Sequence, residues 1–352
     1  MKDLMKKYTR AFSVSGREAS LAAQIAEDLR PFADSVSTDA MGNLIVLKKG
    51  KDGGKKLMLA AHMDEIGFIA TFIEDSGYIR VSNIGGINAV ASAYHKVVFE
   101  NGTTGVLVVE SGTAFGDVAV KKMYVDIGAR SKKEAERKVK VGDCLAVAPE
   151  LTKLGATRYA AKAFDDRLAC ALLAEVARTC AEPACDTYFV FTVQEEVGCR
   201  GSKPAAYAIA PDYAIAVDVT NTGDMIGAPP MTVKLGGGAA IKIKDASVLC
   251  SKVIVDGLTA LAEADKIPYQ YEILVAGGTD TSSMQTAGAG AHAGAVSIPT
   301  RYVHSPVEVV DAKDLDACVK LLRDAGPCSR YCVRPAVSFS RTSFSKRVSR
   351  SR

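Results

Sequence analysis

Short runs of apolar residues, each ending abruptly in polar ones, predict buried β-strands in this chain. Such runs occupy residues 56–61, 187–193 and 213–217, and they are continuous rather than alternating. A helical pattern over about 166–180 separates the first two runs, since Leu168, Leu172 and Val176 repeat at i, i+4 and i+8. Continuous apolar strands linked by such helices indicate a mixed, mostly parallel α/β sheet covered by helices on both faces.

The middle of the chain follows a different pattern. Alternating polar and apolar residues at 78–81 and 96–100, an Asn101-Gly102 turn and many glycines predict a separate small β domain. Because α/β patterns lie on both sides of it, we interpret this segment as an insertion. We therefore expect a discontinuous domain formed by residues 1–67 and 159–334, an inserted β domain at 68–158, and a basic, flexible tail at 335–352.

Composition and charge narrow the possible classes of protein. The 352 residues are 48% hydrophobic and 24% charged, as in globular proteins. The net charge of +4 depends on the last fourteen residues, which hold five basic residues and no acid, so the rest sums to −1. We expect neither a nucleic-acid nor a membrane partner. Nine cysteines without a CxxC pair, and no apolar run of about 18 residues, favour a reduced, cytoplasmic protein.

Histidines and acids follow the predicted strands at the points where the strands end. In a parallel sheet these carboxyl ends meet at one edge, where ligands bind. A helix cap or a turn would explain one such acid, but several unpaired carboxylates at one edge would repel each other and raise their own pKa values. Divalent cations would remove that cost, and imidazoles with carboxylates suit zinc, cobalt or manganese. The residues concerned are His62, Asp64, Asp165, Asp166, Glu195, Glu196, Asp218 and His304.

Six motifs around these residues resemble, in the same order along the chain, those of the tetrahedral (TET) aminopeptidases. That family includes glutamyl and deblocking aminopeptidases with co-catalytic metals. The resemblance extends from about residue 3 to residue 334, so it covers nearly the whole chain. The motifs are 61–68 (AHMDEIGF), 162–167 (KAFDDR), 193–198 (VQEEVG), 216–218 (AVD), 277–280 (GGTD) and 301–306 (RYVHSP).

The resemblance implies two divalent metal ions per subunit and five residues that hold them. Asp165 would bridge both ions. His62 and Asp218 would complete one site, and Glu196 and His304 the other. Zinc is the first choice of metal, with cobalt or manganese as alternatives.

The resemblance also implies a reaction and an assembly. Glu195 matches the general base that takes a proton from a water held between the ions, and Asp64 matches the acid that orients the His62 ring. A cis peptide between Asp165 and Asp166 is expected. The implied fold is zinc-peptidase-like with a PDZ-like β-barrel inserted. The implied function is removal of the N-terminal residue from short peptides by a homododecamer built from dimers.

Other functions stay open at this point. A two-metal sheet could also serve an N-acyl amino acid deacylase or a carboxypeptidase. A glycosidase that uses Glu195 and Glu196 is less consistent, because the two histidines would have no role and the carboxyls of glycosidases usually lie about 5–9 Å apart on separate segments. A non-enzymatic assembly protein would be expected to have lost a ligand or the base. We interpret His95, His292 and Cys199 as structural residues, and the preferred substrate side chain stays undetermined.

Overall fold

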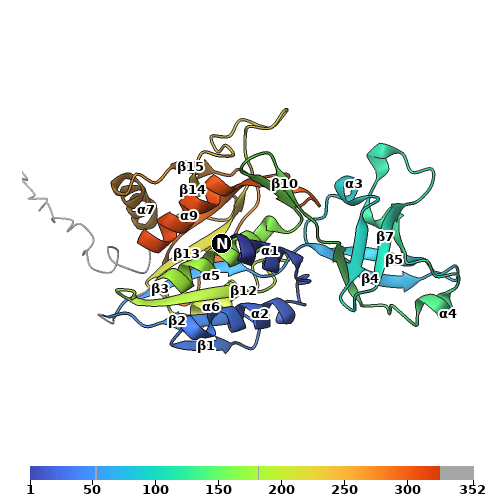
Figure 1. The fold of residues 1–352 in the computed structure, drawn as a ribbon, viewed down its shortest axis with the longest axis horizontal. Helices are drawn as coiled ribbons and strands as arrows, with labels where there is room; N and C mark the ends of the chain where they lie inside the picture. The colour runs from blue at the N-terminus through green and yellow to red at the C-terminus, as the bar shows by residue number, and fades with distance from the viewer. Residues whose placement is uncertain (52–53, 181, 326–352) are drawn as a thin grey trace, which may run out of the picture.

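A large mixed sheet with helices on both faces and a smaller β-barrel beside it make up this protein (Figure 1). The computed structural model describes residues 1–51, 54–180 and 182–325. The predicted tail at 335–352 lies outside the described residues. The large sheet has eleven strands, and nine of them follow the order β1-β2-β12-β3-β13-β16-β17-β11-β10, while β14 pairs with β16 and β15 pairs with β14.

The centre of the sheet is parallel, as the apolar runs predict. Its four strands, β12, β3, β13 and β16, are neighbours in register: Phe191 lies opposite Ala61, and Asp218 opposite Ser297. Their carboxyl ends therefore lie at one edge. The strands span Asp186–Thr192 (β12), Lys56–His62 (β3), Tyr213–Thr220 (β13) and His292–Arg301 (β16).

Antiparallel strands extend the sheet at both sides of this centre. The pair β1 and β2 joins it through β12, and β17, β11 and β10 join it through β16. These strands span Ser35–Thr38 (β1), Leu44–Lys48 (β2), Leu151–Leu154 (β10), Arg158–Ala161 (β11), Ala239–Lys244 (β14), Tyr269–Ile273 (β15) and Glu308–Asp311 (β17).

Helices cover both faces of the sheet, because successive residues of a strand point to opposite sides. In β3, Leu57, Leu59 and Ala61 belong to the core that also includes residues of α1, α2, α5, α7 and α9, whereas Met58 and Ala60 belong to the core under α6 and α8. Both faces are apolar, which explains why the strand sequences do not alternate. The helices span Lys2–Arg10 (α1), Ala19–Leu29 (α2), Phe164–Thr179 (α5), Ser202–Ile209 (α6), Lys252–Ala264 (α7), Asp280–Gln285 (α8) and Ala312–Ala325 (α9).

The inserted segment forms a closed antiparallel barrel with the strand order β4-β5-β8-β7-β6-β9, which confirms the expectation of a small β-barrel. Alternate residues such as Phe68, Phe99 and Leu107 fill its interior. The strands span Gly67–Ile73 (β4), Ile79–Ile84 (β5), Lys96–Phe99 (β6), Thr104–Val109 (β7), Met123–Asp126 (β8) and Cys144–Val147 (β9), and two short helices span Ala89–Ser92 (α3) and Lys132–Ala135 (α4).

The barrel and the large sheet meet at a tightly packed junction. A Cβ atom on Gly67 would lie 2.7 Å from Cγ2 of Val14 and 2.8 Å from the carbonyl oxygen of Leu145. A side chain there would push apart the N-terminal segment and the barrel strand β9, so this position requires glycine.

No helix in the described part of the chain has the length and apolar character that crossing a membrane requires. Free thiols are present at Cys144, Cys170, Cys199, Cys250 and Cys318.

Candidate metal centre

His62 occupies the last position of β3, and its ring faces carboxylates from two other elements. Its Nε2 lies 3.0 Å from Oδ1 of Asp165, the second residue of α5. The same Nε2 lies 3.9 Å from Oδ1 of Asp218, in β13. The His62 side chain is almost fully buried. The ring is therefore held where the sheet and the first turn of α5 meet.

Asp165 lies between the two histidines of the predicted set. Its Oδ1 faces His62, and its Oδ2 lies 3.2 Å from Nε2 of His304. Nε2 of His304 also lies 3.1 Å from Oε2 of Glu196. Each oxygen of this carboxylate is therefore directed at a different imidazole.

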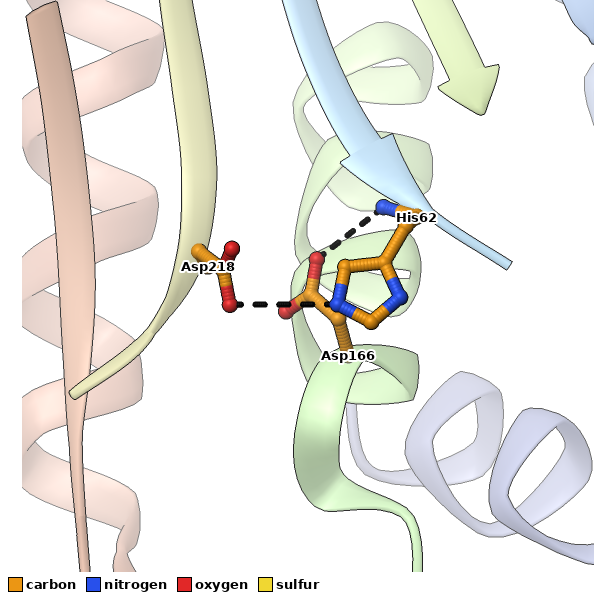
Figure 2. Close-up of side chains that lie close together, drawn as sticks. All are labelled: His62, Asp166 and Asp218. Atoms are coloured by element: carbon orange, nitrogen blue, oxygen red, sulfur yellow. Dashed lines mark hydrogen bonds and ion pairs between the residues drawn. The ribbon is translucent and has the colours of Figure 1, made fainter. Parts of the chain in front are cut away.

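The His62 end of the cluster includes a residue that sequence reasoning named but gave no role. Figure 2 shows Asp166 between His62 and Asp218, with its Oδ2 accepting the backbone N–H of His62 at 3.1 Å. Ligand atoms of these three residues all lie within 4.8 Å of one another. The peptide bond between Asp165 and Asp166 is cis, as the resemblance implies. This geometry lets adjacent aspartates face the same cluster.

The carboxylate of Asp64 contacts both the glutamate pair and the ring of His62. Its Oδ1 and Oδ2 accept the backbone N–H groups of Glu195 and Glu196 at 3.0 and 3.1 Å, and Oδ2 also accepts the Ser15 hydroxyl at 2.6 Å. Its Oδ1 lies 3.4 Å from Nδ1 of His62. Oε2 of Glu195 lies 3.9 Å from Nε2 of His62. All seven predicted site residues therefore meet in one cluster.

Positive φ angles at residues other than glycine gather around this cluster. Of the eight such residues in the described part of the chain, five lie in the site or beside it in sequence. The left-handed region is unfavourable for residues with a Cβ atom, and such strain persists where the surroundings hold it in place. For His304, with φ of 62°, Glu308 does this by accepting the backbone N–H at 2.9 Å. The five residues are Ala163, Gln194, Cys199, Tyr302 and His304.

Burial and mutual repulsion shift the pKa values of the acids. Burial raises the pKa of Glu195 well above its usual range, and the charge of Asp218 adds to this. The pKa of Asp218 rises for the same reason, with burial first and the charge of Asp165 next. For Asp165, burial is outweighed by hydrogen bonds from His304 and His62, which hold the pKa below its usual range. The cluster thus holds more negative charge than its histidines can neutralise.

The surrounding carboxylates also raise the pKa values of the two histidines. Burial disfavours the charged ring of His304, but hydrogen bonds to Asp165 and Glu196 raise its pKa to about 12. The pKa of His62 is also raised well above its usual value, because hydrogen bonds to Asp165 and Asp64 outweigh burial. The surrounding carboxylates therefore favour positive charge at this end of the sheet.

The donor set fits divalent metal ions. Buried carboxylate oxygens without a hydrogen-bond partner are costly, and the cluster contains two, Oδ1 of Asp166 and Oε1 of Glu196. Imidazole nitrogens and carboxylate oxygens are ligands suited to zinc, cobalt and manganese. A second group of ligand atoms within 4.8 Å joins His62, Asp165 and Glu196.

Comparisons with known proteins agree with this chemistry. Residues 42–321 match the model of the M42 glutamyl aminopeptidase family. The chain belongs to this family. It is 45% identical over 326 residues to a protein of Acetivibrio thermocellus named as an aminopeptidase, with 92% of this chain and 98% of that protein covered.

Solved structures of aminopeptidases share the whole fold. One is aminopeptidase APDkam598 from the archaeon Desulfurococcus kamchatkensis, with 37% identity, a TM-score of 0.89, and coverage of 92% of this chain and 93% of that one. Another is the Pyrococcus horikoshii TET1 peptidase, with 32% identity, a TM-score of 0.84 and coverage of 92% and 98%, which can assemble into a tetrahedron or a large octahedral shell. As an M42 protein this chain is a peptide hydrolase of a metal-dependent family.

The M42 site also contains supporting residues that sequence reasoning missed. Glu308, in β17, accepts the backbone N–H of Asp165 at 3.0 Å as well as that of His304. Glu18, just before α2, accepts the backbone N–H of Gln194 at 3.1 Å. Glu308 lies in an apolar stretch without a motif, and Glu18 lies far from the others in sequence, so neither carried a recognisable signal.

The residues that we interpreted as structural lie apart from the ligand cluster, except one. His292 begins β16 at the opposite end from Arg301, and its Nδ1 lies 3.1 Å from the Ser251 hydroxyl. Cys199 is close to the site, because its thiol donates a hydrogen bond to Oε1 of Glu195 at 3.0 Å. The sequence analysis interpreted Cys199 as a structural residue and missed that contact.

Proposed function

We propose that this M42 aminopeptidase removes the N-terminal residue of short peptides with two divalent ions held at the cluster. Asp165 would bridge them, His62 and Asp218 would complete one site, and Glu196 and His304 the other. The observation that supports this most directly is the placement of the Asp165 carboxylate, 3.0 Å from one histidine and 3.2 Å from the other. Zinc suits the ligand set best, and cobalt and manganese accept the same ligands.

The ions, when bound, act as Lewis acids on the peptide carbonyl and lower the pKa of water at the site toward neutrality. The protein must then supply a base that is close to this water yet remains free. Glu195 meets this description, because its carboxylate faces the cluster while its backbone N–H is fixed by Asp64. Burial raises the pKa of this carboxyl, so it holds a proton more readily, which suits a group that first accepts a proton and then delivers it to the leaving amine.

Adjacent glutamates would thus have different roles. Oε2 of Glu196 lies 3.1 Å from Nε2 of His304, so we assign Glu196 to the ligands. Glu195 has its Oε1 bonded by the Cys199 thiol and its Oε2 directed toward His62. Asp64 fixes both backbone N–H groups, and with them the direction in which each side chain leaves the chain.

We also propose that the chain forms dimers through the barrel and that these dimers assemble into a homododecamer. Large apolar side chains are exposed there, among them Tyr94 at 68%, Phe115 at 79% and Val141 at 62%. Such exposed side chains are typical of surfaces that bind another protein. Light scattering after gel filtration should give a mass near twelve subunits. Phe115→Glu should reduce this mass, whereas Lys252→Glu on α7 should not, and a monomeric wild type would contradict the proposal.

The function is tested with aminoacyl chromogenic amides and their N-acetylated counterparts, with and without chelator. The expected result is cleavage of the free-amine substrates alone, lost with chelator and restored by zinc, cobalt or manganese. Glu195→Gln should lose most activity yet keep its metal, measured by mass spectrometry of the elements, whereas the exposed Glu27→Gln on α2 should keep both. Cleavage of acetylated substrates would favour a deacylase instead.

A further inference from the structure

A cleft of about 580 Å³ opens at the cluster of site residues, which form part of its lining. The rest of the lining is formed by Gly86, Gly198, Cys199 and a set of aliphatic, glycine and small polar residues that we call the wall. Within the described part of the chain, the residues that line this wall include no lysine, arginine, aspartate or glutamate. The wall consists of Val219, Thr220, Asn221, Ser247, Leu274, Ala276, Gly277, Gly278, Ser282 and Val303.

Two loops that follow β14 and β15 form much of this wall, and hydrogen bonds join them. The backbone N–H of Leu274 donates to the carbonyl of Lys244 at 3.0 Å, and that of Ala246 donates to the carbonyl of Gly277 at 3.1 Å. A Cβ atom on Gly278 would lie 2.8 Å from Oγ of Ser247. The loops are therefore in close contact, and the wall has a fixed shape.

Buried charges support the wall from inside and do not reach the cleft. Oδ1 of Asp245 accepts the backbone N–H groups of Ser247 and Val248 at 2.7 and 2.9 Å. The ammonium of Lys242, fully buried, forms an ion pair with Glu272 and lies 3.7 Å from Oδ2 of Asp245. Its positive charge is therefore neutralised below the wall, and it is not available to a substrate.

We infer that this cleft selects peptides whose first side chain is neutral, aliphatic or small and polar, over those that begin with an acid or a base. The inference rests on the proposed function. A charged side chain placed against this wall would lose water without gaining a partner of opposite charge. A leucine or alanine side chain would instead contact Leu274, Val219 and Val303. The glutamyl preference in the family's name would then not extend to this chain.

The test measures kcat/KM on the metal-loaded enzyme with five aminoacyl chromogenic amides: leucyl, alanyl, seryl, glutamyl and lysyl. The neutral substrates should be favoured at least about tenfold over both charged ones. A wild type that prefers the glutamyl or lysyl amide would overturn the inference and leave the aminopeptidase function intact. Absence of turnover on all five would instead overturn the proposed function on which the inference rests.

Variants at Ala276 test whether this wall determines the preference for the first side chain of the substrate. Ala276 is exposed, lines the cleft and is free of the hydrogen bonds that join the two loops. Ala276→Lys should shift the ratio of glutamyl to leucyl turnover upward by about tenfold, and Ala276→Asp should do the same for the lysyl substrate. Ala23→Lys, with the same new charge on the exposed surface of α2, is the matched control. Ratios that stay at the wild-type value in both Ala276 variants would show that another surface selects the side chain.

Discussion

The carboxylate of Asp64 lies behind the ring of His62, with Oδ1 3.4 Å from Nδ1. The backbone carbonyl of the same aspartate lies 3.1 Å from that nitrogen. Both are acceptors, so Nδ1 carries a hydrogen, and Nε2 is the nitrogen that faces Asp165. The aspartate thereby holds the direction of the ring, and it would fix the tautomer once Nε2 binds a metal ion.

Replacing this carboxylate should weaken metal binding and activity together. In Asp64→Ala we expect a loss of about 10–100-fold in metal affinity or in kcat/KM, as for other residues behind metal-binding histidines. Competition with a chelating dye measures the affinity. Asp256→Ala, which removes an exposed carboxylate on α7, is the control. Unchanged affinity in Asp64→Ala would show that the backbone carbonyl alone orients the ring.

The variants His304→Ala and His292→Ala should differ sharply in the amount of metal that they bind. His304→Ala removes the nitrogen that lies near both Asp165 and Glu196, so the protein should lose about one of two bound ions. His292→Ala should keep both, because that ring contacts Ser251. Elemental analysis after gel filtration gives the stoichiometry. Equal metal content in the two variants would contradict the proposed ligand set.

Gly86 should be required for the position of His304. Its carbonyl oxygen lies 3.0 Å from Nδ1 of that ring, and a Cβ atom there would lie 2.9 Å from the same nitrogen. Gly86→Ala should therefore displace the ring and lower kcat by a larger factor than a loss of folding stability would explain. The melting temperature of the variant measures that loss of stability. In Gly116→Ala the new methyl group meets no atom within 4 Å, so this variant should resemble the wild type. Full activity in Gly86→Ala would show that His304 tolerates the displacement.

Asp314 should give the fold a measurable dependence on pH. Its carboxylate accepts the backbone N–H groups of Gly236 and Gly238 at 2.7 Å each, yet burial raises its pKa to about 6. An aspartate in an unfolded chain has a pKa of about 3.9. Between these values the folded protein binds more protons, so the stability from protonated Asp314 is complete below about pH 4 and is lost as the pH rises through 6.

The comparison with Asp314→Asn isolates this contribution, because the variant cannot ionise at that position. The melting temperature of the wild type minus that of the variant should be larger at pH 5 than at pH 7.5. The two pH values should be compared in buffers of equal ionic strength. If this difference in melting temperature is constant, or grows with pH, burial does not destabilise the charged form of Asp314.

Several parts of this site were predictable because the sequence marks them locally. The runs that form β3, β12 and β13 are apolar up to the last residues, so the polar side chain at each end, such as His62 or Asp218, is conspicuous. Strand order was not needed to expect that these ends meet, since parallel strands share one edge. The domain boundaries and the role of each site residue stay predictions.

Other parts depend on contacts that no local pattern records. Glu308 acts through backbone N–H groups of residues 143 and 4 positions away, and its neighbours in sequence are ordinary strand residues. The strands β14 and β15, which support the cleft, carry lysine and glutamate at buried positions. Lys242 and Glu272 neutralise each other in the folded chain, but each alone indicates an exposed position. Such pairing becomes visible only once the two strands are adjacent.

Gly86 comes from the segment that follows β5 of the barrel, whereas His304 follows the last parallel strand of the sheet. The chain enters the barrel directly after His62 and Asp64, and it returns to the sheet through β10 and β11 before Asp165. Glu65, before the barrel, and Lys162, after β11, form a buried ion pair. A shortened enzyme with the barrel deleted and its ends rejoined would therefore lose the carbonyl that steadies one histidine and the spacing between the other histidine and Asp165. The inserted barrel is therefore part of the architecture that holds the cluster, and it cannot be removed as a separate module.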